Sequence, residues 1–174
     1  MREYDGKELC ENAAELRAGD EILLSGTVYT ARDAAHKRIK SMIESGEELP
    51  FDLKNSIIYY AGPTPAKPGQ VCGSFGPTTS CRMDPFAPAL YRLGMKATIG
   101  KGDRSDGVKK AIVETGGIYL IAIGGAGALA ASHITECKEI AFCDLGCESV
   151  KKLTFNKFPL IVAIDSKGND IYER

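Results

Sequence analysis

Short apolar segments alternate with an amphipathic one through the middle of this chain. The segments NSIIYYAG (55–62) and IYLIAIGG (118–125) are apolar and end at glycine, which is typical of buried strands. Between them, RSDGVKKAIVETGG (104–117) has the spacing of an amphipathic helix. Strand patterns also occur towards both ends of the chain. This order predicts an α/β fold with a mixed sheet, in one domain that covers residues 1–174.

The same signals predict the remaining elements, and residues 62–80 stand out as a long loop rich in glycine, proline and threonine. A loop of that length inside a compact domain is usually functional or disordered. Further strands are predicted over 21–31, 96–102 and 138–144. The tail, 149–174, is predicted to form more than one strand, the last two joined by a turn at 166–169. Further helices are predicted over part of 8–20 (ending near Gly19), 31–46 (ending at Gly46), about 84–94 (with Pro85 in its first turn) and 126–136.

Charge and hydropathy exclude several classes of protein. The formal net charge is −1, so no basic surface indicates a nucleic-acid partner. The longest apolar run, residues 118–123, is far too short to cross a bilayer. The amino-terminal residues 1–16 are charged and lack the apolar core of a signal peptide. We therefore expect a cytoplasmic protein that binds neither nucleic acid nor membrane.

In a reducing cytosol, cysteines are expected to be thiols rather than a disulfide framework. Cys137, Cys143 and Cys147 come close together, with the spacing C-x5-C-x3-C, which matches none of the usual iron–sulfur patterns. The spacing therefore does not favour a metal site. The chain has six cysteines: Cys10, Cys72, Cys81, Cys137, Cys143 and Cys147.

The segment IYLIAIGGAGALAA has the outline of a dinucleotide-binding turn. A predicted strand runs into G-x-G-x-x-A at Gly125, Gly127 and Ala130, and Asp144 ends the next predicted strand, where an acid would bind a ribose. The pattern is short and permissive, and such fingerprints usually open their domain. Small residues here could equally let a helix pack closely on a sheet. A nucleotide-binding module is therefore an alternative only.

The segment ARDAAHKR places Arg32 and His36 four residues apart on one face of a predicted helix. Arg32 lies in the first turn, where backbone N–H groups and the helix dipole favour anions. From the spacing alone, the simpler interpretation is that both side chains lie at the surface.

The segment FGPTTSCRMD (75–84) places Thr78, Thr79, Ser80 and Arg82 just before a predicted helix. Hydroxyls and free backbone N–H groups at a helix start can bind a carboxylate, and arginine can bind one through two hydrogen bonds. A helix cap accounts for one hydroxyl but not for three in a row, so we favour a binding role.

Lys101 lies between two glycines in IGKGDR, where the backbone can approach a ligand beside a single ammonium group. The segment does not fit a phosphate-binding loop, and a surface turn is equally consistent with it. Together with Arg32 and Arg82, Lys101 indicates a small polyanionic ligand such as a dicarboxylate.

Six segments in order resemble one family: SGTVYTARDAAHKR, IIYYAGPTP, GSFGPTTSCRMD, IGKG, GGAGAL and FPLIVAIDSKGN. From about Gly19 onward, the chain is similar to the beta subunit, equivalent to the carboxy-terminal domain, of class I fumarases and L(+)-tartrate dehydratases. The combination of ARDAAHKR, GPTTS-x-RMD and GKG is specific.

The resemblance implies an iron–sulfur hydro-lyase that adds or removes water across a carbon–carbon double bond of a dicarboxylic acid. Interconversion of fumarate and malate is the expected reaction, and dehydration of L(+)-tartrate is the alternative. A partner alpha subunit would supply the 4Fe-4S cluster through three cysteines, with one iron open to substrate, so this chain would bind no metal and would be inactive alone. An α2β2 heterotetramer and a swivelling β/β/α domain are further expectations. A purely structural or regulatory subunit is the remaining alternative.

The resemblance also implies roles for individual residues. Thr78 matches the threonine proposed for proton transfer, although a hydroxyl needs a depressed pKa or a relay to act as a base. Thr79 is expected to bind substrate beside it, and His36 to have a supporting role. The positions that bind the carboxylates in the family match Arg32, Arg82 and Lys101.

Overall fold

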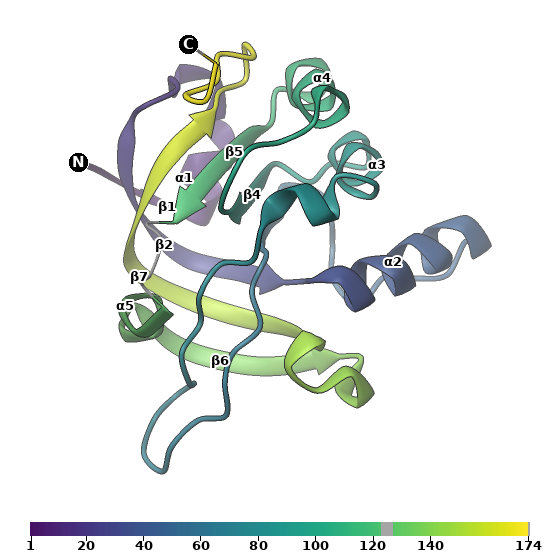
Figure 1. Cartoon of the computed structure of the whole chain (residues 1–174), viewed down its shortest axis with the longest axis vertical. Coiled ribbons are helices and arrows are strands. Elements are labelled where there is room, and N and C mark those ends of the chain that lie inside the picture. Colours follow the sequence, from purple (N-terminus) through teal and green to yellow (C-terminus); the bar gives the residue numbers. More distant parts are fainter. Residues whose placement is uncertain (123–126, 174) are drawn as a thin grey trace.

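Among the residues that the structure describes, a mixed sheet of seven strands forms the centre of the molecule, with strand order β1-β2-β3-β4-β5-β7-β6 (Figure 1). The computed structural model describes residues 1–122 and 127–173. The strands are β1 (Arg2–Asp5), β2 (Glu21–Thr30), β3 (Ile57–Tyr59), β4 (Ala97–Gly100), β5 (Ile118–Ala122), β6 (Ile134–Ala141) and β7 (Val150–Ile164). The α-helices are α1 (Gly6–Glu11), α2 (Asp33–Ser45), α3 (Ala87–Arg92), α4 (Asp106–Thr115) and α5 (Gly127–Ser132), and the 3-10 helices are η1 (Ala13–Glu15), η2 (Ser80–Met83) and η3 (Cys143–Glu148).

The sheet closes on itself because β2 also pairs with β7. Strands β1 to β5 run parallel to one another, whereas β7 is antiparallel to β2, β5 and β6. The β2–β7 pairing extends from Glu21 opposite Ile161 to Tyr29 opposite Lys152. Its register shifts at Gly26, which has a φ of 97°, and such a bulge bends a strand as barrel closure requires. The mixed α/β fold predicted from the sequence is confirmed, with a barrel-like closure in addition.

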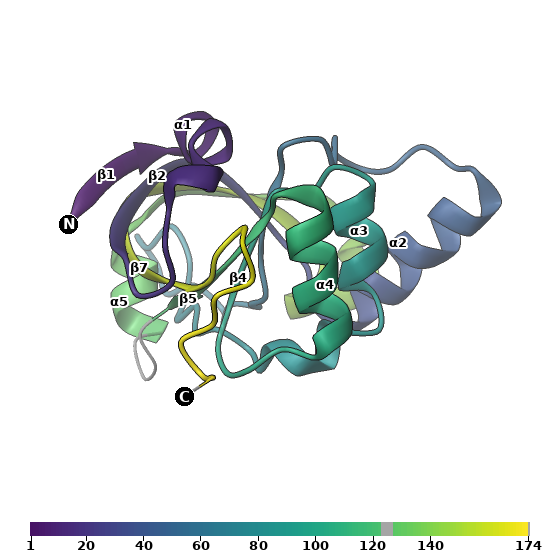
Figure 2. The ribbon, with the colours of Figure 1, turned by 90° about the horizontal axis from the view of Figure 1, so that it is seen from above.

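Alternate residues of the strands face two separate cores. In β3, Ile57 and Tyr59 belong to the cluster inside the closed sheet, whereas Ile58 and the following Tyr60 belong to the cluster under the helices. Figure 2 shows α2, α3 and α4 together on one side of the barrel, and these helices cover the second cluster. Strands buried on both faces read as continuous apolar runs, as the segment IIYY does.

Local signals determine the two longest helices. Helix α2 ends at Gly46, with a φ of 71°, and α4 ends at Gly116, with a φ of 65°. Both glycines adopt the left-handed conformation that favours glycine after a helix. These two helices are confirmed, as are the strands predicted over 21–31, 55–62 and 96–102 and the described part, 118–122, of the strand predicted over 118–125.

The predicted ends of several helices and strands are wrong, in places where pairing between segments far apart in the sequence determines the structure. The helix predicted over 84–94 begins only at Ala87, with proline at its start, and Ser80–Met83 forms a separate 3-10 turn. Residues 134–136 join β6 rather than a helix, because they pair with β7. The tail forms one strand of 15 residues up to Ile164, and after the turn Asp170 pairs back with Ile164 in an isolated bridge.

The predicted loop projects from the body of the molecule between β3 and η2 (Figure 1). Its base is fixed by a hydrogen bond of 2.9 Å from Thr64 N to the carbonyl of Ser74 and by another of 2.9 Å from Phe75 N to the carbonyl of Gly127. The loop then returns beside β3, where Ala61 pairs with Pro77. This return brings the segment FGPTTSCRMD to the edge at which β3 ends.

Candidate functional site

Residues predicted for the site lie at the carboxyl ends of three adjacent parallel strands. Arg32 follows β2 by two residues, Lys101 follows β4 directly, and Thr78 N donates a hydrogen bond of 2.7 Å to the carbonyl of Tyr60, which follows β3. Ligands of α/β proteins commonly bind outside the carboxyl ends of parallel strands. The fold therefore gathers these side chains from three distant segments at one edge of the sheet.

The hydroxyl-rich segment lies beside the lysine turn. Thr79 forms a parallel bridge with Lys101, and Ser80 N donates a hydrogen bond of 2.9 Å to the Lys101 carbonyl. Thr79 and Lys101 are exposed and Thr78 is half-buried, whereas Ser80 is fully buried. The prediction that all three hydroxyls are available to a ligand is therefore wrong for Ser80, whose Oγ points into the protein and accepts a hydrogen bond from Lys101 N.

Arg82 lies beside the amino-terminal end of α2. Its Nε donates a hydrogen bond of 3.0 Å to Oδ1 of Asp33, and its side chain is 52% exposed. This contact brings Arg82 next to the residue that follows Arg32. An ion pair that is half exposed adds little stability, so Arg82 can exchange this partner for a ligand carboxylate at small cost.

A carboxylate of the chain itself lies at the start of α2, where the sequence predicts an anion. Glu148 Oε2 accepts a hydrogen bond of 3.1 Å from Ala34 N, and Glu148 Oε1 lies 3.7 Å from Arg32 Nη2. Among the residues that the structure describes, the buried Nε of Arg32 has no hydrogen-bond partner. The helix start thus has the predicted preference for an anion, and Arg32 keeps an unused donor.

His36 is buried, with 1% of its surface exposed, so the prediction from spacing that it lies at the surface is wrong. Its Nδ1 is 2.8 Å from the carbonyl of Arg32, and its ring packs against Tyr60 and Phe86. Burial, together with the charge of Arg104, lowers the pKa of His36 to about 4. A neutral imidazole at this position contacts the backbone that carries Arg32 and adds no positive charge to the site.

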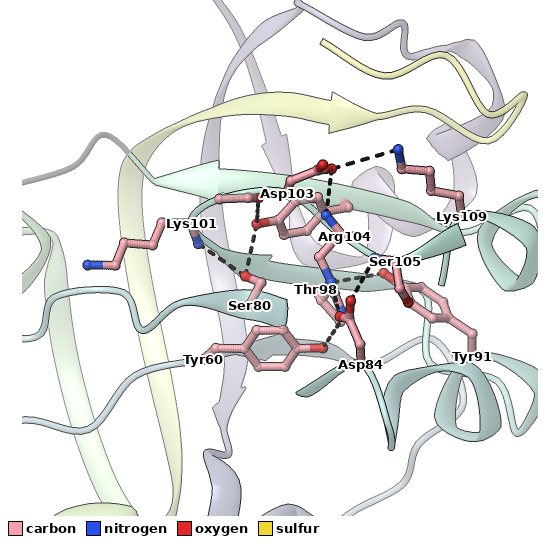
Figure 3. Close-up of polar contacts among 12 residues, drawn as sticks. Tyr60, Ser80, Asp84, Tyr91, Thr98, Lys101, Asp103, Arg104, Ser105 and Lys109 are labelled. Carbon is pink, nitrogen blue, oxygen red and sulfur yellow. Dashed lines mark hydrogen bonds and ion pairs between the residues drawn. The ribbon is translucent and has the colours of Figure 1, made fainter. Parts of the chain in front are cut away.

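A buried polar network beneath the site is missed by sequence reasoning (Figure 3). Arg104 Nε donates to Asp84 Oδ1 at 2.7 Å, and its remaining nitrogens reach Thr98 Oγ1 at 3.1 Å and Tyr60 Oη at 3.3 Å. Tyr119 Oη lies 2.8 Å from Ser80 Oγ. In Figure 3 the ammonium of Lys101 points away from this network. Nothing in the segments GKGDR and IYLIAI distinguishes these side chains from surface or core residues.

The cysteines give no sign of a metal centre within this part of the molecule. Across residues 1–122 and 127–173, no three His, Cys, Asp or Glu side chains come together as ligands for a metal ion. Cys143 and Cys147 are exposed thiols and Cys137 is half-buried.

The described part of the segment GGAGALAA, from Gly127 onward, does not support a dinucleotide-binding turn. Gly125 lies outside the described residues. A side chain at Gly127 would meet Ser74 Oγ at 2.2 Å, so the projecting loop, rather than a ligand, makes the close approach there. The carboxylate of Asp144 is paired with Arg38, with Nη1 and Oδ1 2.7 Å apart.

Comparison with known proteins identifies the family. Residues 3–174 match the family model described as "Fumarase C-terminus". The chain belongs to this family. The resemblance drawn from the motifs is thereby confirmed over nearly the whole sequence.

Relatives within the fumarase C-terminus family differ in length. The chain is 42% identical over 94% of its length to "Fumarate hydratase 2" of Leishmania major, of which it covers 29%. It is 37% identical over 97% of its length to "Fumarate hydratase class I, anaerobic" of Escherichia coli, of which it covers 31%. It is 44% identical over 98% of its length to "Putative L(+)-tartrate dehydratase subunit beta" of Methanocaldococcus jannaschii, of which it covers 91%. The chain thus spans under a third of these fumarate hydratases and nearly all of the named subunit.

No helix within residues 1–122 and 127–173 is long and apolar enough to cross a membrane.

Proposed function

We propose that this chain is the beta subunit of a two-subunit hydro-lyase that adds or removes water across the double bond of a dicarboxylic acid. One observation carries the proposal: Arg32, Lys101 and the Thr78 segment meet at the ends of three adjacent parallel strands in a fumarase C-terminus domain. The whole chain, residues 1–174, would act as one swivelling β/β/α domain that closes over the partner.

The cations of the site suit two carboxylates. Arg82 would bind one carboxylate through its planar guanidinium, and Lys101 and Arg32 would bind the other groups of the anion. The side chain of Lys101 is exposed, which supports its availability to a ligand. These charges would also stabilise the extra negative charge that develops when a proton leaves the carbon next to a carboxylate.

Thr78 would lie at the reacting carbon and Thr79 beside it. The backbone of Thr78 is held in place by its hydrogen bond to the Tyr60 carbonyl. A threonine hydroxyl is a weak base unless cations lower its pKa or a relay removes its proton. The neighbouring positive charges of Arg82 and Lys101 would favour such a role. His36 would support Arg32 through the backbone carbonyl that its ring contacts.

The open shape of the site argues for a partner. Small ligands are usually buried over most of their surface, yet Thr79, Arg82 and Lys101 are exposed. The larger cavities of the described residues lie elsewhere, with about 600 Å³ beside α1 and about 450 Å³ beside α5. A second protein surface would therefore complete the site. We propose that an alpha subunit supplies it, in an α2β2 assembly in the cytoplasm, where the six free thiols would persist.

The partner would also carry the 4Fe-4S cluster, whose exposed iron supplies Lewis-acid chemistry in such hydro-lyases. The residues of this chain would bind and orient the substrate, exclude water, and hold a proton at Thr78.

Reconstitution with the partner tests the proposal. The chain alone should have no hydratase activity, and mixing it with the cluster-bearing subunit should restore turnover of fumarate or L(+)-tartrate. In the assembled enzyme, Arg82→Ala should lower kcat/KM by at least about tenfold, since a charge-assisted hydrogen bond to a carboxylate is lost. Arg92→Ala is the matched control, because Arg92 is an equally exposed arginine that pairs with Glu114 on α4.

Each alternative has its own outcome. Turnover by the purified chain alone would overturn the two-subunit proposal. An unchanged kcat/KM for Arg82→Ala would remove Arg82 from the site and favour a structural or regulatory subunit. Binding of NAD to the chain would favour the nucleotide-binding module. Fumarate and malate are the expected pair, and the close match in length to a protein named as a tartrate dehydratase subunit makes L(+)-tartrate the second substrate to assay.

A further inference from the structure

Two buried hydroxyl groups, those of Ser80 and Tyr119, bind the turn that carries Lys101, and Figure 3 shows the contact between Ser80 and Lys101. Lys101 N donates a hydrogen bond of 3.1 Å to Ser80 Oγ, and Tyr119 Oη lies 2.8 Å from the carbonyl oxygen of Gly102. The two bonds hold the backbone on both sides of Lys101. They are linked to each other, because Tyr119 Oη also lies 2.8 Å from Ser80 Oγ.

Both hydroxyl-bearing residues are shielded from water. Ser80 and Tyr119 each have 0% of their surface exposed. A buried hydrogen bond resists exchange with water, and a buried polar group left without its partner is destabilised. Burial also raises the pKa of the Tyr119 phenol, so the hydroxyl remains a donor over the whole physiological pH range. Loss of either contact would therefore leave a buried polar group without its partner.

The neighbouring glycine makes room for this arrangement. A Cβ at Gly100 would lie 1.9 Å from Ser80 Oγ, so the serine hydroxyl occupies the space of the missing side chain. Gly102, on the other side of Lys101, has a φ of 80°, which favours glycine. The sequence G-K-G thus allows Ser80 and Tyr119 to reach the backbone of the turn, while the lysine side chain remains exposed on the other side.

The same contacts connect Lys101 to the hydroxyl segment. Ser80 N donates to the Lys101 carbonyl at 2.9 Å, so Ser80 contacts both the N–H and the C=O of Lys101. Ser80 follows Thr78 and Thr79 directly and precedes Arg82 by two residues. One residue, through its side chain and its backbone N–H, therefore fixes the lysine turn relative to the segment that bears the proposed base and the proposed carboxylate-binding arginine.

We propose that Ser80 and Tyr119 are positioning residues that set the location of the Lys101 ammonium relative to Thr78 and Arg82. This inference rests on the proposed function, in which Lys101 binds a substrate carboxylate. Neither residue touches the substrate, since both act through the backbone of the turn. Small displacements of a charged group in a catalytic site cause large losses of rate, which gives such a device a measurable effect.

A double-mutant cycle in the assembled two-subunit enzyme tests the inference. Tyr119→Phe keeps the ring and removes only the hydroxyl, and it should lower kcat/KM by roughly tenfold, chiefly through a higher KM. In a Lys101→Ala background the same substitution should change kcat/KM by less than about twofold, because the group that it positions is absent. Tyr91→Phe is the matched control, since Tyr91 is an equally buried tyrosine whose hydroxyl contacts Thr98 and the Ile118 carbonyl but not the lysine turn.

The outcomes separate this inference from the proposed function. If Lys101→Ala leaves kcat/KM unchanged, the proposed function is wrong about Lys101 itself. If Lys101→Ala lowers kcat/KM but Tyr119→Phe has the same effect in both backgrounds, or none, the positioning role is wrong and the proposed function stands. A coupling with Lys101 as large for Tyr91→Phe as for Tyr119→Phe would also overturn the positioning role.

Amide hydrogen exchange of the unsubstituted assembled enzyme gives a second measurement that does not depend on how the variants fold. The Lys101 N–H should exchange slowly although the lysine side chain is exposed, because Ser80 Oγ accepts its hydrogen bond in a buried position. Exchange at the rate of an unprotected amide would overturn the inference.

Discussion

Asp84 Oδ1 lies 2.7 Å from Nε of Arg104, whose side chain has no exposed surface. The second oxygen of Asp84 accepts a hydrogen bond of 2.6 Å from Ser105 N, at the start of α4. Arg104 is further bound by Thr98 and Tyr60, so the buried charge has both a counter-ion and neutral partners. The ion pair joins η2, which carries Arg82, to the loop that carries Lys101.

Loss of one member of this buried pair should destabilise the chain strongly. Arg104→Met leaves the Asp84 carboxylate buried with only the Ser105 amide as a partner, so we expect a loss of about 3–5 kcal/mol in the free energy of unfolding. Arg92→Met is the control, because the Arg92–Glu114 pair is exposed and such pairs contribute at most about 1 kcal/mol. Urea denaturation measures both, and equal losses would show that Arg104 has no special structural role.

Substitution of alanine for two different glycines should change the stability of the chain in opposite directions. Gly100→Ala places a Cβ 1.9 Å from Ser80 Oγ, and overpacking of this kind costs about 1–3 kcal/mol. Gly107 lies in α4, has no positive φ, and a Cβ there meets nothing closer than 3.8 Å. Gly107→Ala should therefore stabilise the chain by up to about 1 kcal/mol through helix propensity. Thermal unfolding compares the two variants, and a stabilising Gly100→Ala would contradict the close contact with Ser80.

The stability of the chain should fall between about pH 6.5 and pH 4 because of His36. Burial lowers the pKa of His36 to about 4 in the folded chain, whereas the value in an unfolded chain is near 6.5. Between these values the unfolded chain binds a proton that the folded chain does not, so protonation favours unfolding. Above pH 6.5 this contribution is fully present, and its loss over the interval amounts to roughly 3 kcal/mol.

His36→Phe keeps a ring between Tyr60 and Phe86 and removes the titration. Urea denaturation of both proteins from pH 4 to pH 7.5 measures the difference, and carboxylates that titrate in the same range cancel in it. The unsubstituted chain should lose more stability on acidification than the variant. Parallel profiles would mean that His36 is accessible to protons in the folded chain.

Elements set by local signals were predictable from the sequence, and those set by distant pairing were not. Strand β2 and helix α2 follow from an apolar run and from a glycine in the left-handed conformation. Strand β1 has only Tyr4 buried, and its residues form a strand because they pair with β2. Strand β7 continues through Pro159 because three other strands pair with it. Barrel closure therefore has no local signal in the sequence.

The same division applies to the candidate site. Arg32, Arg82 and Lys101 could be selected because unusual glycine, proline and hydroxyl residues surround them. The residues that fix these segments could not, because Tyr119 belongs to an ordinary apolar strand and Arg104 to a charged turn. Their role depends on contacts between residues that are 20 to 39 positions apart. His36 was wrongly expected at the surface because spacing shows which face of a helix a residue occupies, but not what covers that face.

Glu148 caps helix α2, although it lies 114 positions after Ala34 in the sequence. Removal of the Glu148 carboxylate should loosen the first turn of the helix. Its N-cap residue, Arg32, makes no side-chain cap, and Glu148 on η3 accepts the hydrogen bond of Ala34 N instead. Glu148→Ala should cost about 1 kcal/mol of unfolding free energy and speed amide exchange at Ala34. Glu148→Gln keeps an acceptor oxygen and should recover most of that stability. Glu44→Ala, at the exposed far end of the same helix, should have an effect near zero, and a loss equal to that of Glu148→Ala would show that η3 does not cap α2.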